Sequence, residues 1–350
     1  MNIDDLVREN IRNLIPYTSA RSEHSNTTGI LLDANENSIG STVKKGLNRY
    51  PDPLQHRLKE KLALQKRINE DQLFLGNGSD EAIDLLIRAF CIPGEDKILI
   101  TPPTYGIYAV YAEINDIQVL KIPLNEQYDL NIDNIIERID RNTKLIFFCS
   151  PNNPTGNCLN HEAILKILKH FHGITVIDEA YLDFANETTW INSLDQFEKL
   201  VVLQTFSKAW GLANIRLGMA FANPHIIQIL NRIKYPYNIN GLTQHLALQA
   251  LKNSDKKERM VSQIIEQREY LRSKLYHLPI VKKIYPSQAN FLLIKFFSAR
   301  EVYNYLIKSN IIVRDRSNVI LCDNCLRITV GSREENELLI RTLKKMEKKQ

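Results

Sequence analysis

The chain has 350 residues, of which 44% are hydrophobic and 24% charged, so it is typical of a globular protein with about two domains. Its 45 lysines and arginines exceed its 40 aspartates and glutamates by five, an excess too diluted to indicate a nucleic-acid-binding protein. Glycine is scarce, with 13 residues where average usage would give roughly 25, so the place of each glycine is informative.

The sequence contains no signal for a membrane or for export. No apolar run approaches the ~18 residues of a membrane span, and the first residues carry charges throughout. Five cysteines form an odd, sparse set, and we expect them to be reduced in a cytoplasmic protein. Cys322 and Cys325 form a CxxC pair, but no further ligand follows at zinc spacing, so we expect no metal site.

Helical and strand patterns alternate through the middle of the chain. Apolar residues recur with helical spacing over 81–90, and Pro93–Gly94 ends that helix. The strands expected next are 97–100, 117–122, 144–149, 174–177, 200–203 and 216–221, and the helices are 104–113, 130–139 and 161–172. This order predicts an α/β large domain with a mostly parallel sheet covered by helices on both faces.

The last third of the chain has a different pattern. Residues 241–277 predict one or two charged helices that connect two domains. A smaller α+β domain is expected from strands at 291–296, 311–313 and 326–330 and from helices that begin at Ala299 and Glu334. We therefore expect a large domain over 41–240 and a small one over 241–350. Residues 1–40 are expected to form an N-terminal arm, as part of the small domain or of a subunit contact.

Polar loops follow three of the expected parallel strands. These loops are Ser150–Gly156, Asp178–Tyr181 and Gln204–Lys208. In open α/β sheets, ligands bind outside the carboxyl ends of the strands. We therefore expect the three loops to form one site.

Three side chains near these loops can support covalent cofactor chemistry. Lys208, if partly buried, would have a lowered pKa and act as a nucleophile and base, although a surface lysine fits the same pattern. Asp178 at a buried strand end needs a cationic or hydrogen-bonded partner, which is a pyridinium nitrogen in a cofactor site or an arginine in a salt bridge. Arg216 can hold a phosphate with two hydrogen bonds or form a surface ion pair.

The turn Gly76–Glu81 comes directly before an expected helix. Its glycines let the backbone approach an anion, and helix N-terminal amides point at such an anion. A plain cap made by Ser79 or Asp80 fits the same residues, and the turn is neither a P-loop nor a dinucleotide fingerprint. Together with Ser207, these features supply an amine, a carboxylate and phosphate donors, which are the parts that pyridoxal phosphate requires.

Longer motifs extend this interpretation over residues 14–335. On Asn152–Gly156, Asp178–Tyr181 and Thr205–Gly218, the chain resembles the fold-type-I pyridoxal-phosphate aminotransferases. Four further segments are similar to the histidinol-phosphate group of that family, namely Ile15–Arg21, Leu32–Asn37, Asn48–Pro53 and Leu326–Gly331.

The resemblance implies a role for each residue around the cofactor. Lys208 would bind pyridoxal phosphate covalently and move the proton, and Asp178 would keep the ring nitrogen protonated. Asn153 and Tyr181 would hydrogen-bond the ring oxygen, and Tyr105 would stack on the ring. The cofactor phosphate would be bound by Ser79, Asp80, Glu81, Ser207 and Arg216, and by Tyr50 from a neighbouring subunit, which implies a homodimer with shared sites.

The resemblance also implies the substrate side of the site. Arg327 would anchor an anionic group, because a planar guanidinium accepts both phosphate and carboxylate. Weaker contacts are expected from Arg314, Tyr17 and Asn153. The implied reaction transfers an amino group between L-histidinol phosphate and 2-oxoglutarate in histidine biosynthesis, giving imidazole-acetol phosphate and L-glutamate.

Other functions stay open at this point. An aromatic or broad-range aminotransferase and a threonine-phosphate decarboxylase use the same scaffold. A transcription regulator that carries such a domain is the alternative from another class, but the motifs begin near Leu14, so we expect no DNA-binding domain. The expected partners are small molecules, with neither nucleic acid nor membrane among them.

Overall fold

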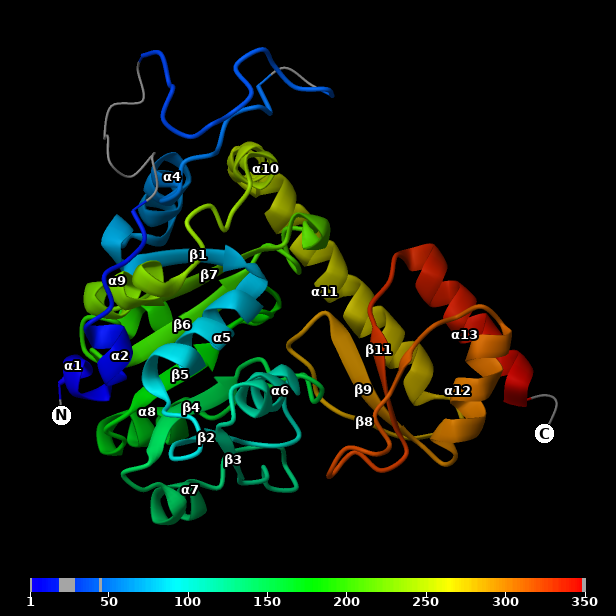
Figure 1. Cartoon of the computed structure of the whole chain (residues 1–350). Coiled ribbons are helices and arrows are strands. Elements are labelled where there is room, and N and C mark those ends of the chain that lie inside the picture. The colour runs from blue at the N-terminus through cyan, green and yellow to red at the C-terminus, as the bar shows by residue number, and fades with distance from the viewer. Residues whose placement is uncertain (1, 19–28, 44–45, 348–350) are drawn as a thin grey trace.

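The computed structural model describes residues 2–18, 29–43 and 46–347, so Ser19–Arg21 of the first motif lies outside the described residues. The chain forms two units that are joined by a long helix (Figure 1). The larger unit contains a seven-stranded sheet in the order β1-β7-β6-β5-β4-β2-β3, and the smaller one contains a four-stranded sheet in the order β10-β11-β9-β8. The expected fold class, a large α/β unit with a smaller α+β unit, is confirmed.

The strands of the larger sheet are mostly parallel. They are β1 (Leu73–Asn77), β2 (Lys97–Ile100), β3 (Gln118–Lys121), β4 (Thr143–Cys149), β5 (Ile174–Asp178), β6 (Leu200–Thr205) and β7 (Leu217–Ala222). Strands β2 to β6 pair in parallel, whereas β7 is antiparallel to both β6 and β1. The carboxyl ends of β4, β5 and β6 therefore meet at one edge.

Helices cover both faces of this sheet. They are α1 (Ile3–Leu6), α2 (Glu9–Arg12), α4 (His56–Lys66), α5 (Gly78–Phe90), α6 (Ile107–Ile114), α7 (Ile132–Arg138), α8 (His161–His170) and α9 (Pro224–Ile233). Alternate residues of β4 enter different cores: Phe147 packs with α5 on one face, and Phe148 packs with α8 on the other. This period of two is what a strand buried on both sides requires.

The first described residues of the chain pack on the larger unit. Ile3, Leu6 and Val7 are buried in the core that α5 and α9 form, so α1 packs on the large sheet and not on the smaller unit. The chain then leaves the body, and residues 29–43 lie beyond α4 and α10 in Figure 1.

The smaller unit follows two connecting helices. The connecting helices are α10 (Gly241–Leu251), which packs against α4 of the larger unit, and α11 (Ser254–Tyr276). The smaller unit itself contains β8 (Val281–Ile284), β9 (Phe291–Phe296), α12 (Ala299–Lys308), β10 (Arg314–Asp315), β11 (Cys325–Thr329) and α13 (Arg333–Glu347). The buried Arg268 of α11 donates hydrogen bonds to the carbonyls of Phe184 and Ala289, and thereby ties the two units together next to the site.

The sequence prediction of a strand at 311–313 is wrong. Pairing begins only at Arg314, which lies opposite Arg327 of β11, whereas Ile312 is exposed. Strands β1 and β8 and helices α4 and α9 were not predicted. The apolar run of β1 has only three residues before Gly76, and two of the four residues of β8 are lysines.

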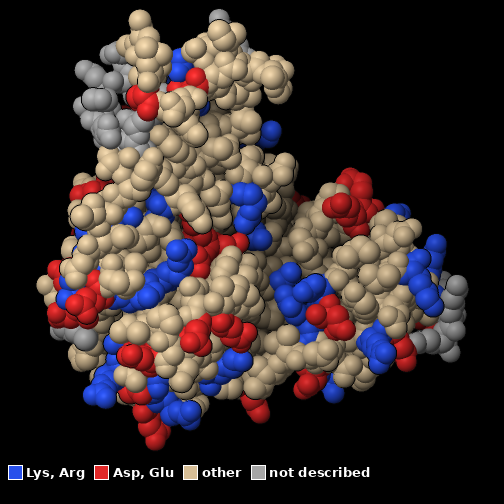
Figure 2. All heavy atoms as spheres, in the orientation of Figure 1, with Lys and Arg blue, Asp and Glu red and all other residues tan. Residues whose placement is uncertain are grey.

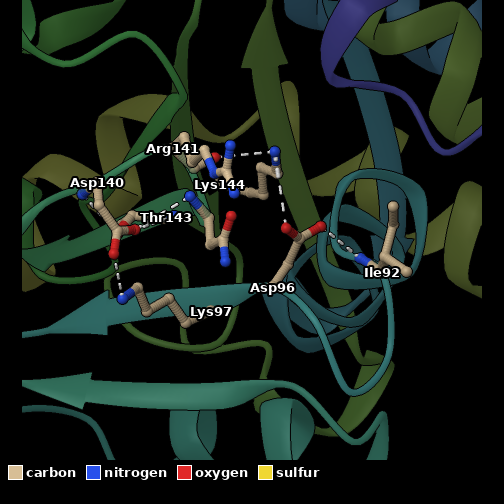
Figure 3. A network of polar contacts seen from close by, with 8 residues as sticks. Ile92, Asp96, Lys97, Asp140, Arg141, Thr143 and Lys144 are labelled. Carbon is tan, nitrogen blue, oxygen red and sulfur yellow. Dashed lines mark hydrogen bonds and ion pairs between the residues drawn. The ribbon is translucent and has the colours of Figure 1, made fainter.

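A network of charged side chains holds the opposite edge of the large sheet, where β2 and β4 begin (Figure 3). Lys97 contacts Asp140 at 2.6 Å, and Lys144 contacts Asp96 at 3.6 Å. The Asp96 carboxylate also accepts a hydrogen bond from the backbone N–H of Ile92. These contacts fix the amino-terminal ends of the strands and leave the carboxyl ends for ligands.

The surface carries both signs of charge. Figure 2 shows lysine and arginine side chains interspersed with aspartate and glutamate over the face drawn. In the described part of the chain, no helix is long and apolar enough to cross a membrane.

Candidate active site

A cavity of about 430 Å³ lies at the carboxyl ends of the parallel strands, with walls from both units. Most of the side chains predicted from the sequence line it. They are Ser79, Asp80, Tyr105, Asn153, Asp178, Tyr181, Ser207, Lys208, Arg216, Arg314 and Arg327.

Asp178, the last residue of β5, forms the floor of the cavity. Its side chain is 2% exposed, and its two oxygens accept hydrogen bonds from the Tyr108 hydroxyl at 2.8 Å and from the Ala180 N–H at 3.0 Å. Burial raises the pKa of Asp178 to about 6, although both hydrogen bonds act in the opposite direction. Among the described residues, no lysine or arginine forms an ion pair with it. At neutral pH, the floor of the cavity is therefore a buried carboxylate without a cationic partner.

Tyr108 is a residue of this site that the sequence analysis missed. It is fully buried on α6, where its ring stacks on Phe147 with centroids 4.8 Å apart. It also meets the edge of Tyr105 at 5.5 Å. Because Tyr108 lies on the apolar side of a helix, its pattern is that of an ordinary core residue, and only its hydroxyl at Asp178 reveals the role.

Lys208 lies in the loop that follows β6 and is only partly buried. Burial is the main cause that lowers the pKa of Lys208, and the charge of Arg327 lowers it further. The charges of Asp178 and Asp80 act the other way. A lowered pKa increases the share of the neutral amine, which is the nucleophilic form. The Lys208 Nζ lies 5.5 Å from the centroid of the Tyr181 ring.

The turn before α5 forms the opposite wall of the cavity. Gly78 has a positive φ of 71° and donates its N–H to the Arg216 carbonyl at 2.8 Å. A Cβ at Gly218 would overlap the backbone of Gly78 and Ser79, so only glycine lets β7 approach the start of α5 this closely. The Arg216 guanidinium contacts Asp80 at 3.1 Å and is half exposed. The wall thus combines helix amides with a cation, a combination suited to a phosphate.

The loop after β4 is held by hydrogen bonds within the loop, to the loop after β2 and to the smaller unit. Asn152 is buried and donates hydrogen bonds to the Pro103 carbonyl and to the Thr155 hydroxyl, both at 2.8 Å. Its neighbour Asn153 accepts a hydrogen bond from Arg327 of β11. The loop thereby holds Arg327 of the smaller unit against the larger one within the cavity.

Three predicted residues do not line the cavity. Glu81 instead accepts hydrogen bonds from the Asn77 N–H and the Asn238 amide, so it supports the turn and does not line the cavity. Tyr50 stacks on Tyr237 with centroids 4.5 Å apart, and Tyr17 is 78% exposed.

The sequence analysis also missed Arg316, which lines the cavity beside Arg314 and Arg327. Arg314 and Arg316 are separated by one residue in the sequence RDR, which places both side chains on one side of an extended segment. This spacing is a signal that could have identified Arg316.

Cys149 also lines the cavity, and burial raises the pKa of its thiol.

The cavity thus brings a partly buried lysine, a buried carboxylate and several arginines together at the carboxyl ends of the parallel strands. Residues 22–343 match the family model described as aminotransferase class I and II, and the chain belongs to that family. The family expected from the motifs is thereby confirmed.

Within this family, the chain is similar to several proteins named as histidinol-phosphate aminotransferases. A histidinol-phosphate aminotransferase of Cytophaga hutchinsonii is 52% identical over 343 residues, which cover 98% of this chain and 99% of that protein. One of Parabacteroides distasonis is 50% identical over 345 residues and covers 99% of both chains. The crystal structure of the histidinol-phosphate aminotransferase from Clostridium acetobutylicum has a TM-score of 0.80 at 26% identity, covering 87% of this chain and 92% of that one.

The Tyr108 hydrogen bond gives a first testable prediction. Tyr108→Phe removes a bond that stabilises the charged form of Asp178, so we expect the pKa of Asp178 to rise from about 6 to roughly 7. The pKa of Asp178 is measured by a pH titration followed by NMR, on cofactor-free protein whose aspartate residues are isotopically labelled. Tyr111→Phe is the matched control, because it makes the same change on α6 away from Asp178. An unchanged titration of Asp178 in Tyr108→Phe would contradict the assignment.

Proposed function

We propose that this cavity binds pyridoxal phosphate and that the protein transfers the amino group between L-histidinol phosphate and 2-oxoglutarate. The observation that carries the proposal is that one cavity contains both the Lys208 amine and the buried Asp178 carboxylate, which has no cationic partner among the described residues. The substrate is supported by the two relatives, which are named as histidinol-phosphate aminotransferases and match almost the full length of the chain.

The residues present fit this cofactor. A protonated pyridine nitrogen would supply the positive charge that the buried Asp178 carboxylate lacks. Ser207, Arg216 and the N-terminal amides of α5 would hold the phosphate at the opposite wall. When bound, pyridoxal phosphate supplies an electron sink for the pair left when the substrate Cα–H bond breaks.

The side chains of the protein would supply proton transfer, the charge at the ring nitrogen and the placement of the ring. Lys208 Nζ would move the proton between the substrate Cα and the C4′ carbon of the cofactor. The lowered pKa of Lys208 suits a general base. Asp178 would keep its charge at the ring nitrogen, held in place by Tyr108. Tyr105 and Tyr181 would confine the ring plane, and burial raises the pKa of both hydroxyls, which therefore stay protonated and able to donate hydrogen bonds.

Arg327 would bind the anionic group of each substrate in turn. Burial lowers the pKa of its guanidinium, and Asn153 and the Phe291 ring hold it in position. The phosphate of histidinol phosphate and the α-carboxylate of glutamate can both occupy such a planar fork.

A homodimer is part of the proposal. The side chains of Ile30, Leu32, Ile39 and Val43 are between 81% and 95% exposed in the segment that leaves the body. Apolar side chains that are exposed together in this way mark an interaction site. A second copy that covers them would bring Tyr50 towards the neighbouring cavity, which agrees with its position outside its own. A cytoplasmic location also belongs to the proposal, supported by five free cysteines.

Replacement of the reactive lysine tests the reaction. For Lys208→Ala we expect at least a roughly hundredfold loss of transamination, since a positioned acid–base group contributes that much. Lys252→Ala, an exposed lysine outside the cavity, is the control. Turnover of Lys208→Ala close to that of wild type would rule out the mechanism.

The substrate is tested on wild-type enzyme with a panel of histidinol phosphate, phenylalanine, tyrosine and O-phosphothreonine. We expect the highest kcat/KM for histidinol phosphate, with 2-oxoglutarate required. Release of CO₂ from O-phosphothreonine without an oxo acid would instead identify a decarboxylase.

Subunit mixing tests the shared site. Tyr50→Ala and Lys208→Ala should each be impaired as homodimers, whereas a mixed dimer would contain one intact site. Random exchange makes half of the dimers mixed, so we expect roughly a quarter of wild-type activity after mixing. If Tyr50 served its own subunit, mixing would restore nothing.

A further inference from the structure

The cavity wall that the smaller unit contributes is a cluster of three arginines. Arg314 of β10 lies directly opposite Arg327 of β11, and Arg316 continues the ladder by donating its N–H to the Cys325 carbonyl at 2.9 Å. All three side chains line the cavity. The pairing of β10 with β11 therefore concentrates three guanidinium groups at one place.

Few donors of this cluster bond to other protein groups, and Arg314 is exposed. Within the described ranges, only Arg327 of the three has a side-chain hydrogen bond, to Asn153, and none of them forms an ion pair with a carboxylate. The Nε of Arg316 is buried and has no hydrogen-bond partner. A buried donor without an acceptor is costly to the folded protein, so this atom indicates that a ligand supplies the acceptor.

The charges point to the kind of ligand. Burial lowers the pKa of Arg316, and the charges of Arg327 and Arg314 lower it further. A single carboxylate can occupy one guanidinium fork and neutralise one charge. A phosphate monoester carries nearly two charges at neutral pH and offers three acceptor oxygens, so it matches a cluster of several guanidiniums better than a carboxylate does.

We propose that Arg316 is a specificity-determining residue that binds the substrate's phosphate group beside Arg314 and Arg327, and so favours phosphorylated amino compounds over amino acids. The proposal rests on the proposed function, because it requires a phosphorylated substrate in this cavity. It assigns Arg327 to both substrates and Arg316 to the phosphorylated one.

The test compares substrates that differ only in the phosphate. Arg316→Gln keeps a polar side chain and removes the charge, and half-reactions of the holoenzyme are measured with histidinol phosphate, histidinol and glutamate. For histidinol phosphate we expect kcat/KM to fall roughly 10- to 100-fold, as for the loss of hydrogen bonds to a charged group. For histidinol and glutamate we expect a change of less than about threefold.

Arg341→Gln, an exposed arginine of α13, is the control for loss of one positive charge and should leave all three substrates unchanged. Equal losses for the three substrates in Arg316→Gln would mean that Arg316 only maintains the fold of the wall, and would overturn the proposal. No loss for histidinol phosphate would overturn it as well.

Competition by inorganic phosphate separates this proposal from the proposed function. Phosphate should inhibit the half-reaction of the wild-type enzyme with glutamate. In Arg316→Gln, we expect the inhibition constant for phosphate to be about tenfold higher. That result together with no wild-type turnover of histidinol phosphate would reject the proposed substrate but retain Arg316 as a phosphate ligand. Equal inhibition of the two proteins would reject Arg316 as a phosphate ligand, whatever the substrate.

Discussion

The buried carboxylate of Asp178 is the constraint on which the site depends. It lies at the end of a central strand, 2% exposed, where two hydrogen bonds compensate only part of its lost hydration. A cation that entered from the cavity would stabilise a charge in this position. In the proposed function, that cation is the protonated ring nitrogen of the cofactor, so the same interaction holds the ring and prepares it to accept electrons.

The sheet arranges the rest of the site around this carboxylate. Parallel strands β4, β5 and β6 end at one edge and present Asn153, Asp178 and Lys208 together. Strand β7 returns antiparallel, and its close approach at Gly218 sets the start of α5 as the phosphate wall. Among the described residues, the smaller unit contributes Arg314, Arg316 and Arg327 to the lining. In the proposed function, the larger unit therefore holds the cofactor, and the smaller unit supplies the arginines for the anionic group of the substrate.

The sequence predicted the parts of the site that lie at strand ends, because the carboxyl ends of parallel strands share an edge. Lys208 and Asp178 could be identified in this way. Tyr108 could not, since a tyrosine on an apolar helix face has the pattern of a core residue. The position of β10 was missed because the strand begins only at Arg314, after the apolar residues on which the prediction of 311–313 was based. Tyr50 and Tyr17 were predicted from motifs alone and lie outside this cavity.

The protonation state of the bound cofactor tests the account most directly. Wild-type enzyme and Asp178→Asn are loaded with pyridoxal phosphate labelled with ¹⁵N in the ring, and the nitrogen shift is measured by NMR at pH 8. We expect the shift of a protonated pyridinium in the wild type and that of a neutral pyridine in the variant, because only an ionised partner holds the proton there. A neutral pyridine in the wild type would contradict the account.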